Sequence, residues 1–350
     1  MKLKELTKAE FRKFTAKCEV DDFLQSLEMF ERYQTIEKEA YLLGVEQNGK
    51  LLAAALLVAK RTRFGKIFNA PRGFLMDYEA TNSRQVFKFF TQSLQGYLRE
   101  KQGIMLQISP KISHIVETDR QGNLQEKAWQ EGKWWRDFLR SLKYKELGEF
   151  EQVKWIYSLD LAEFEPEQAA KRLRSGHKWS IRYARERYGV KIRKLSYDEL
   201  EKFKKLVEEA GEKHIFQDPS LDYYQEMYRA FGKKVKFLVA ERENQILAGA
   251  MFVLYGNEVT YLFSGMRGEL KKYGGAHLLQ WQMLQEAKKQ GFKKYNFYST
   301  RPEPGNGVYE FKRGFRGEVE EMLGTFVLPV NLKGWLYAKK MRYQKFGKIK

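Results

Sequence analysis

The chain has 350 residues, 43% hydrophobic and 31% charged, so it is long enough for one or two domains with a large buried core and is not a disordered chain. Its single cysteine, Cys18, excludes an internal disulfide, and no run of about 18 apolar residues predicts a membrane span. The first residues lack the apolar core of a signal peptide, so we expect a cytoplasmic protein. Lys and Arg number 64 against 45 Asp and Glu, a net charge of +19, which favours a polyanionic partner: RNA, an anionic membrane face or a phosphorylated substrate.

The first part of the chain predicts helices, a hairpin and a buried strand. Residues 1–40 are expected to be helical, with Asp22 able to cap a second helix that starts near Phe23 and carries Arg32. Asn48-Gly49 between two apolar runs predicts a β-hairpin. A third strand is expected over 66–74, a helix over 83–101, a buried strand over 104–108 and a helix around 134–142.

The same pattern returns later in the chain, after an expected strand over 153–159 and a helix beginning at Pro166. Residues 239–250 match residues 44–55 position by position, at an offset of 195 (239 − 44), and predict a second hairpin. A helix over 277–290, Gly291 and a strand over 295–297 then match the earlier helix, Gly103 and strand. The period is far longer than that of a solenoid, so it indicates an internal duplication of one α/β unit.

The stretch from 295 to 317 carries the main candidate for chemistry. It predicts a strand, a loop interrupted by Pro302 and Pro304, and then the segment 308–315. A cation after a strand end and a bent loop commonly holds an anionic group or a developing oxyanion, so Lys312 is the candidate catalytic residue and Phe311 is expected to shape its pocket. The candidate wall residues of a substrate pocket are Tyr223, Tyr224, Tyr298 and Tyr309. The alternative is a surface loop followed by a Lys-rich helix.

A basic block covers residues 171–193, which hold nine Lys or Arg and one acid. The candidate RNA contacts in it are Lys171, Arg174, Lys178, Arg182 and Arg185. On a helix over 179–188, the last three lie on one face and form a stripe that tracks a phosphate backbone. Trp179 and Tyr183 are suited to stack on unpaired bases. The alternative is a solvated helix face.

The C-terminal residues 322–350 contain no acid and alternate basic with aromatic and aliphatic residues. This composition predicts a basic amphipathic helix. Such a helix suits two surfaces: the anionic inner leaflet of a membrane, or the first unit, where it would bind tRNA. Both alternatives stay open from the sequence.

Four segments occur in order along nearly the whole chain: FLQS at 23–26, NAPRGFLMD at 69–77, SGHKWSIRYARERYGV at 175–190 and GVYEFKRGF at 307–315. Together they resemble signatures of the FemABX family, the peptidoglycan-bridge aminoacyltransferases, with Phe74 where that family usually has Pro. The chain also departs from the family at Ser109-Pro110, where Asp-Pro is usual, and a serine cannot act as the general base considered for that aspartate.

The resemblance implies an α/β (α+β) fold of two tandem GNAT-like acyltransferase domains, with mixed sheets flanked by helices. The internal repeat supports this independently, because a hairpin, a helix and a strand match the core of the GNAT fold. The expected domains are 1–150, joined by the C-terminal segment 331–350, and 151–330. The stretch 191–211 is too short for the long helical hairpin of larger family members, so the chain resembles the shorter ones.

The resemblance further implies an aminoacyltransferase that acts as a monomer on aminoacyl-tRNA and a peptidoglycan precursor, either lipid II or UDP-MurNAc-pentapeptide. The amino acid would move to an amine of the stem peptide in bridge formation, and the reaction needs no metal or other cofactor. Arg32 is the implied contact to the nucleotide-sugar part of the precursor, and Arg72 is expected to fix a loop or a phosphate.

Two other functions remain as alternatives. Residues 271–276 resemble the pyrophosphate loop of a CoA-dependent N-acyltransferase, with Lys271 where Gln or Arg is usual. A non-catalytic RNA-binding or membrane-binding protein would equally explain the net charge. The four histidines lack metal-ligand spacing with Cys or Glu, so no metal site is expected.

Overall fold

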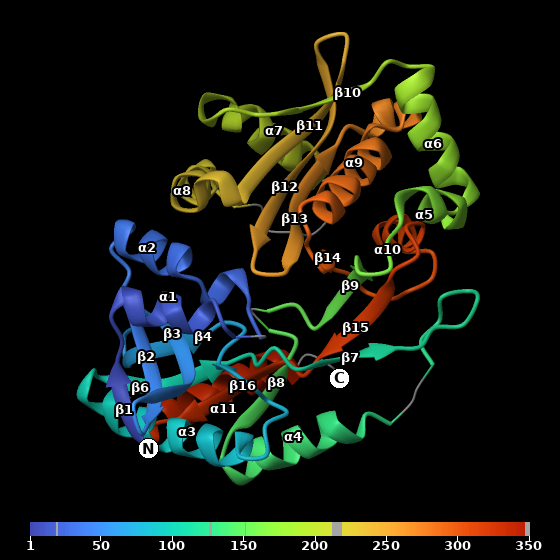
Figure 1. Cartoon of the computed structure of the whole chain (residues 1–350). Helices are drawn as coiled ribbons and strands as arrows, with labels where there is room; N and C mark the ends of the chain where they lie inside the picture. The colour runs from blue at the N-terminus through green and yellow to red at the C-terminus, as the bar shows by residue number, and fades with distance from the viewer. Residues whose placement is uncertain (19, 126–127, 151, 212–218, 347–350) are drawn as a thin grey trace. The chain divides into compact units, whose positions relative to one another are not determined.

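The computed structural model describes residues 1–18, 20–125, 128–150, 152–211 and 219–346. Its packing divides the chain into two compact units (Figure 1). Unit 1 consists of residues 1–114, 127–154 and 321–350, and unit 2 consists of residues 115–126 and 155–320. Each unit is built on a mixed sheet that has helices on both faces.

The sheet of unit 1 has the order β1-β2-β3-β4-β6-β16-β8 among the described residues, with β5 paired to β3. Its strands are β1 (Lys2–Glu5), β2 (Ala40–Gln47), β3 (Lys50–Thr62), β4 (Gly65–Ala70), β5 (Leu75–Met76), β6 (Gly103–Ile108), β8 (Lys145–Gly148) and β16 (Thr325–Pro329). Its helices are α1 (Lys8–Thr15), η1 (Phe23–Gln25), α2 (Leu27–Thr35), α3 (Ser83–Glu100), α4 (Gln130–Ser141) and α11 (Leu332–Phe346). Neighbouring strands are antiparallel except β4 and β6, which are parallel.

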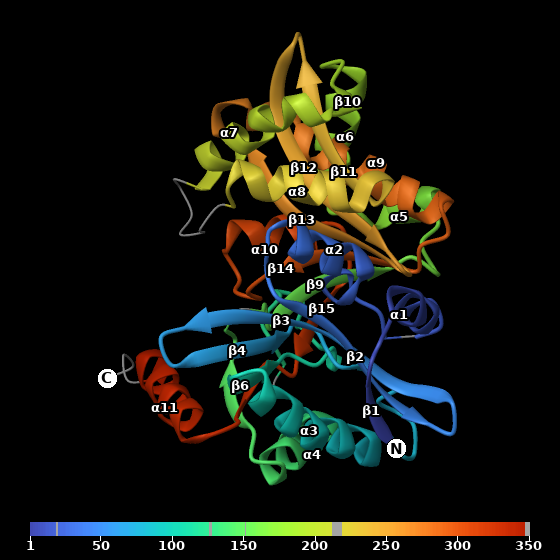
Figure 2. The ribbon, with the colours of Figure 1, turned by 90° about the vertical axis from the view of Figure 1, so that its left-hand side faces the viewer.

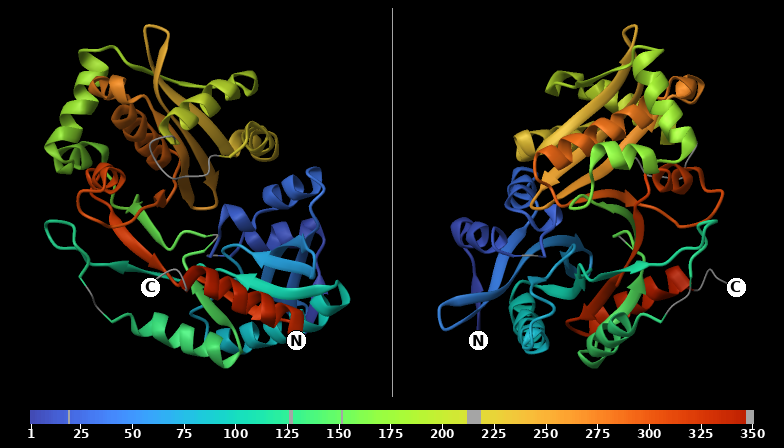
Figure 3. Two further views of the ribbon diagram at one scale, coloured as in Figure 1. Left: turned by 180° about the vertical axis from the view of Figure 1, so that it is seen from behind. Right: turned by 45° about the vertical axis from the view of Figure 1, so that its right-hand side comes forward.

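Alternation along the strands places α3 and α11 on opposite faces of this sheet (Figure 2). Phe68 and Leu106 pack with Phe87 and Phe90 of α3, in the core that α4 also covers. Ile67 and its neighbours on the other face pack with Ala338 of α11. Figure 3 shows α11 beside β6 and β16. The period of two along each strand therefore decides which helix covers which face.

The sheet of unit 2 has the order β10-β11-β12-β13-β14-β9-β15-β7 among the described residues. Its strands are β7 (Ser113–Val116), β9 (Trp155–Asp160), β10 (Lys191–Lys194), β11 (Val235–Arg242), β12 (Gln245–Tyr255), β13 (Glu258–Met266), β14 (Lys294–Ser299) and β15 (Glu318–Met322). Its helices are α5 (Pro166–Arg172), α6 (Ser175–Glu186), η2 (Tyr197–Glu199), α7 (Leu200–Gly211), α8 (Leu221–Phe231), η3 (Gly232–Lys234), η4 (Gly268–Tyr273), α9 (Gly275–Lys289) and α10 (Gly307–Arg313). Helix α9 packs on β11 and β12, and α6 packs on α9 (Figure 1).

The two hairpins predicted from the repeat are confirmed. The turns Asn48-Gly49 and Glu243-Asn244 both have two residues with positive φ, as the tightest hairpin connections require. A register shift follows Val45 in the first hairpin and Ala240 in the second, so even the bulge recurs at the offset of 195. The duplication seen in the sequence is therefore a duplication of backbone geometry.

The two sheets differ where their parallel strands meet. In unit 1, β4 and β6 stay paired from Lys66 to Ala70, with Ile108 opposite Ala70. In unit 2, the pairing of β13 with β14 stops at Thr260 and Asn296, although both strands continue. The far end of β14, residues 297–299, therefore leaves β13, and its backbone groups are available to other partners.

Some expected boundaries were wrong, because tertiary pairing overrode the local pattern. Residues 2–5 were expected to be helical but form β1, which pairs with 43–46 of β2. The C-terminal helix begins only at Leu332, because residues 325–329 form β16 between β6 and β8. The third strand ends at Ala70 rather than at 74.

Helices α7 and α8 have 12 and 11 residues, so the described part of unit 2 carries no long helical arm, as predicted.

Membrane crossing requires a helix that is both long and apolar, and no helix in the described ranges meets that requirement.

The FLQS segment has a structural role that the sequence did not reveal. Gln25 is fully buried, and its side-chain amide donates to the carbonyls of Leu56 (3.1 Å) and Pro71 (2.8 Å) and accepts from the Leu56 N–H (2.8 Å). Ser26 caps α2 by accepting from the Met29 N–H.

We predict that Gln25→Leu lowers the free energy of unfolding by at least about 2 kcal/mol, because each buried polar group left unpaired costs about 1–3 kcal/mol. Urea unfolding of the full chain measures this. Gln34→Leu, an exposed position on α2, is the matched control and should change stability by less than about 0.5 kcal/mol. Equal stabilities of the two variants would contradict the role given to Gln25.

Candidate active site

The GVYEFKRGF segment forms the short helix α10 (Gly307–Arg313). Asn306 caps it, because its side-chain oxygen accepts from the N–H groups of Val308 (3.0 Å) and Tyr309 (3.2 Å). The loop with Pro302 and Pro304 precedes this cap and cannot join either β14 or the helix. Helix α10 therefore presents its residues on two sides, toward the end of β14 and toward the 119–123 turn.

Lys312 lies on the β14 side and is only 4% exposed. Its ammonium donates to the carbonyl of Tyr298 (3.4 Å) and to that of Ser299. Burial lowers the pKa of Lys312 to about 7. An ammonium has three donors, and the described chain supplies acceptors for two of them. Within the described ranges, the third N–H of Lys312 is left without a hydrogen-bond partner.

A bulge at the end of β14 aims these two carbonyls. The register of β14 against β9 shifts between Asn296 and Ser299, and Tyr298 within the shift has a φ of +59°. The side-chain oxygen of Asn296 accepts from the Tyr298 N–H at 2.7 Å, which holds the bulge closed. Positive φ is costly for a tyrosine, so this conformation needs such support.

Glu258 in turn fixes the Asn296 amide. Its carboxylate accepts from the Asn296 side-chain N–H (2.9 Å) and from the Thr260 hydroxyl (3.0 Å), and all three side chains are buried. Sequence reasoning missed Glu258 and Asn296. The one available signal was a polar residue in the middle of the apolar strand 295–297. A chain of hydrogen bonds thus runs from Glu258 through Asn296 and Tyr298 to Lys312.

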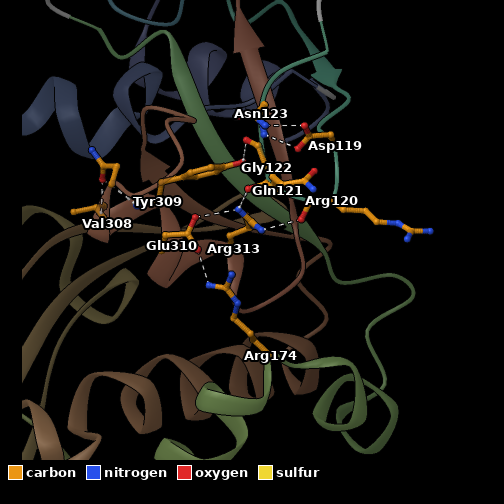
Figure 4. A network of polar contacts seen from close by, with 11 residues as sticks. Asp119, Arg120, Gln121, Gly122, Asn123, Arg174, Val308, Tyr309, Glu310 and Arg313 are labelled. Atoms are coloured by element: carbon orange, nitrogen blue, oxygen red, sulfur yellow. Dashed lines mark hydrogen bonds and ion pairs between the residues drawn. The ribbon is translucent and has the colours of Figure 1, made fainter.

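The other side of α10 is tied to neighbouring segments of unit 2 (Figure 4). Glu310 pairs with Arg174 (2.6 Å) and Arg313 (3.0 Å), and the hydrogen bond from Arg174 lowers its pKa. The Arg313 guanidinium donates to the carbonyls of residues 120 and 121. The Tyr309 hydroxyl donates to the carbonyl of Gly122 at 3.1 Å, and the ring is 1% exposed. Tyr309 and Arg174 thus hold α10 in place.

Phe311 contacts two histidines, neither of which supplies a cation at neutral pH. Its carbonyl accepts from the Nε2–H of His177 (2.7 Å), and its ring lies 5.0 Å from that of His277. Burial lowers the pKa of His177, and it lowers the pKa of His277 to about 3. Both rings are therefore neutral near pH 7, and Lys312 is the cation beside Phe311.

The remaining candidate substrate residues lie elsewhere. Tyr224 on α8 is fully buried, with its ring against Phe203 and Phe263, so it meets core side chains rather than solvent; Tyr223 beside it is half-buried. Arg32 and Arg72 belong to unit 1, and both are buried. Arg72 has a positive φ and donates to the carbonyl of Val153 at 2.9 Å, so it joins two loops of that unit. Of the predicted site residues, Lys312, Tyr298 and Phe311 lie together in the structure.

The basic block forms α5, α6 and β10, and α6 carries the predicted stripe. Lys178, Arg182 and Arg185 are exposed on it, as is Lys171 on α5. Trp179 is 50% exposed, with its ring 4.5 Å from that of Tyr183 and the Arg182 guanidinium 4.9 Å from its centre. The inner side of α6 is apolar, with Ile181 and Ala184 buried. Helix α6 therefore displays cations and an aromatic pair outward.

Comparisons with known proteins agree with this architecture. The FemAB family model matches residues 6–243 and 240–340. Aminoacyltransferase FemA of Staphylococcus aureus (strain MRSA252) is 24% identical, over 95% of this chain and 96% of its own length. FemA of Staphylococcus epidermidis (strain ATCC 12228 / FDA PCI 1200) is 23% identical over the same shares of the two chains.

Two solved structures resemble the fold. A crystal structure of FemX has a TM-score of 0.80 at 16% identity, over 97% of this chain and 100% of that one. A tandem GNAT protein from the clavulanic acid biosynthesis pathway has a TM-score of 0.54 at 10% identity, over 94% of this chain and 98% of that one. These likenesses confirm the predicted fold of tandem GNAT-like units with mixed sheets and flanking helices.

The family model covers nearly the whole chain, and the segments that resembled the family lie within the matched residues. The chain belongs to the FemAB family and is an aminoacyltransferase.

Proposed function

We propose that this chain transfers an amino acid from aminoacyl-tRNA to the stem-peptide amine of a peptidoglycan precursor, and so builds an interpeptide bridge. The observation that carries the proposal is the buried Lys312 ammonium, which two backbone carbonyls hold in place and which keeps one N–H for a further oxygen. The aminoacyltransferase relatives support the reaction class.

The reaction is attack by an amine on the ester carbonyl of the charged tRNA. A carbon–nitrogen bond forms, the carbonyl oxygen becomes an oxyanion, and the carbon–oxygen bond to the tRNA ribose then breaks. The amine proton passes to the ribose oxygen that leaves, so no side chain is needed as base. This fits Ser109, whose hydroxyl is buried and hydrogen-bonded to the Thr325 hydroxyl at 3.0 Å.

Lys312 is the catalytic cation in this proposal. Its third N–H binds the oxyanion, in a site where low solvent exposure makes such a hydrogen bond strong. Tyr298 and Phe311 are the neighbouring wall residues. Glu258 and Asn296 act through the bulge and are positioning residues, because the Lys312 ammonium donates to the Tyr298 and Ser299 carbonyls and not to either of them.

The exposed stripe of α6 is the proposed contact to the tRNA backbone, and Trp179 with Tyr183 is suited to stack on bases near the acceptor end. The acceptor is lipid II or UDP-MurNAc-pentapeptide, with Arg32 and Arg72 as the proposed residues on its side. Arg72 would act by holding its loop, since its guanidinium donates to Val153. The enzyme would then work in the cytoplasm, at or near the inner face of the membrane.

A CoA-dependent reaction is less well supported. The pyrophosphate of CoA would need the loop before α9, and Gly274 of that loop lies against α6. A Cβ at Gly274 would be 2.4 Å from the carbonyl oxygen of Ser180. Gly274 is therefore packed closely against the backbone of α6, with no room for a side chain on that side.

We predict that Lys312→Met lowers the transfer rate by about 10²–10³-fold at saturating substrates, because one donor to the oxyanion is lost. The assay is transfer of a labelled amino acid from charged tRNA to a muropeptide precursor. Lys293→Met, an exposed position beside β14, is the matched control and should keep the rate. Full activity of a folded Lys312→Met chain would contradict the catalytic role proposed for Lys312.

The pH dependence of the transfer rate distinguishes two roles of Lys312: an ammonium that donates to the oxyanion, or a neutral amine that acts as a base. Since burial lowers the pKa of Lys312 to about 7, the ammonium is present below that pH and is lost above it. We therefore predict that the transfer rate falls as the pH rises through about 7. Lys312→Arg should lack this decline, because its guanidinium stays protonated. A rate that rises through about 7 would mean that the neutral amine acts as a base.

Asn296→Ala should release the bulge and admit water to Lys312. We expect a lower transfer rate with little change in KM, and a decline that moves to higher pH because a hydrated ammonium has a higher pKa. Rate profiles of the variant and the parent chain over pH 6–9 measure both effects. A slower variant with an unmoved decline would mean that Asn296 is only structural.

The stripe on α6 can be tested by changing Lys178, Arg182 and Arg185 together to Gln. We expect weaker tRNA binding and a slope of log Kd against log salt that is smaller by about 2–3, because each lost phosphate contact removes about 0.7–0.9. The control changes three exposed lysines of α7, η3 and α9: Lys202, Lys233 and Lys289. Equal salt slopes of the two triple variants would mean that tRNA binds a surface other than α6.

A further inference from the structure

Unit 1 has a cationic depression that the transfer reaction does not use. It measures about 780 Å³ and is lined by residues 61–66 at the tip of the β3–β4 hairpin, by residues 99 and 102–104, and by residues 331–333 at the start of α11. Its five charged lining residues are all cations: Arg61, Arg63, Lys66, Arg99 and Lys333. A hollow with a single sign of charge attracts an anion.

Three of these cations are not neutralised by the chain. Glu39 pairs with Arg61 and Lys66, at 2.6 Å each. Arg63 instead lies over the ring of Phe64, and Arg99 donates to the carbonyl of Val330 at 3.3 Å. Within the described ranges, no carboxylate lies within ion-pair distance of Arg63, Arg99 or Lys333. The depression therefore keeps a net positive charge.

Large apolar side chains surround the same place. Phe64 and Leu332 line the depression and are 43% and 72% exposed. Trp335 and Leu336, one turn further along α11, are 42% and 55% exposed. The opposite side of α11 is seated on the sheet, since a Cβ at Gly334 would clash with the carbonyl of Ile104 and Ala338 is buried. Leu332, Trp335 and Leu336 therefore face outward because the helix is fixed in that orientation, and Phe64 is exposed at the tip of the β3–β4 hairpin.

We propose that this surface, the hairpin tip with the first two turns of α11, binds an anionic phospholipid bilayer. A lipid phosphate occupies the depression between Arg63, Arg99 and Lys333, and Phe64, Leu332, Trp335 and Leu336 enter the boundary between headgroups and acyl chains. Lys145 and Lys339, which lie 5.1 and 5.5 Å from the Trp335 ring centre, add charge at headgroup level.

Exposed aliphatic residues decide between a membrane and RNA. Bases stack on aromatic rings and guanidinium planes, whereas Leu332 and Leu336 offer neither. Both gain free energy when acyl chains replace the surrounding water. Membrane binding by this surface does not depend on the transfer reaction, so the two are tested independently.

The test is co-sedimentation of the full chain with vesicles of equal parts phosphatidylglycerol and phosphatidylcholine, and with vesicles of phosphatidylcholine alone. We expect binding to the anionic vesicles only. The double variant Arg63→Gln with Lys333→Gln should weaken that binding about tenfold or more, since each basic residue near the membrane surface raises the affinity for an anionic bilayer several-fold. Lys88→Gln with Lys133→Gln, exposed on α3 and α4 across the sheet, is the charge-matched control and should bind as the parent chain does.

A second pair of variants tests insertion rather than charge. Leu332→Gln with Leu336→Gln should also lose vesicle binding, whereas Ile115→Gln with Phe150→Gln, exposed apolar positions elsewhere, should not. Brominated phospholipid should quench part of the tryptophan fluorescence of the parent chain and less of that of Trp335→Phe. Unchanged vesicle binding in both surface variants would overturn the proposal. Loss of tRNA binding in Arg63→Gln with Lys333→Gln, with vesicle binding kept, would assign the surface to RNA.

Discussion

A lysine ammonium held among backbone carbonyls is the interaction on which the active-site region of unit 2 depends. Burying Lys312 is unfavourable unless acceptors replace water, and the carbonyls of Tyr298 and Ser299 do so. Those carbonyls point at the ammonium only because β14 bulges away from its partner strands. The bulge in turn needs Asn296, and the Asn296 amide is oriented by Glu258. One cation therefore depends on a polar network that reaches across the sheet to β13.

The two duplicated units differ, in the described residues, at the strand end that holds the proposed site. Both units repeat the hairpin, its bulge, the following helix and a parallel strand pair. In unit 1 the parallel pair stays joined to its end, and its backbone groups are used in the ladder. In unit 2 the pair separates early, which leaves the end of β14 free to turn toward α10. A small difference in strand pairing thus distinguishes the β4–β6 pair of unit 1 from the strand end at which we propose the reaction takes place in unit 2.

Several residues of the family-like segments hold the backbone in place. Gln25 joins η1 to the edge of β3, Arg72 joins two loops, and Tyr309 anchors α10 to the 119–123 turn. Each donates to a backbone carbonyl of another segment, and a buried carbonyl left without a partner is costly. A polar residue in a short motif therefore need not touch a substrate. The polar side chains that can bind a substrate are also the ones that can hold a loop in one conformation.

The sequence by itself determined the repeated unit, the hairpins, most helices and the family, because these follow from local periodicity, turn chemistry and short motifs. It also predicted a catalytic role for Lys312, which stays a prediction. It predicted a helix over 2–5 and over 325–329, where strands exist, since β1 and β16 are stabilised by distant partners rather than by local propensity. Only the tertiary structure decided that Tyr224 and Tyr309 are buried, that Arg174 pairs with Glu310, and that Asn296 and Glu258 support Lys312. Those contacts join residues from about 15 to nearly 190 positions apart, and no local pattern encodes which of many polar residues will meet across such distances.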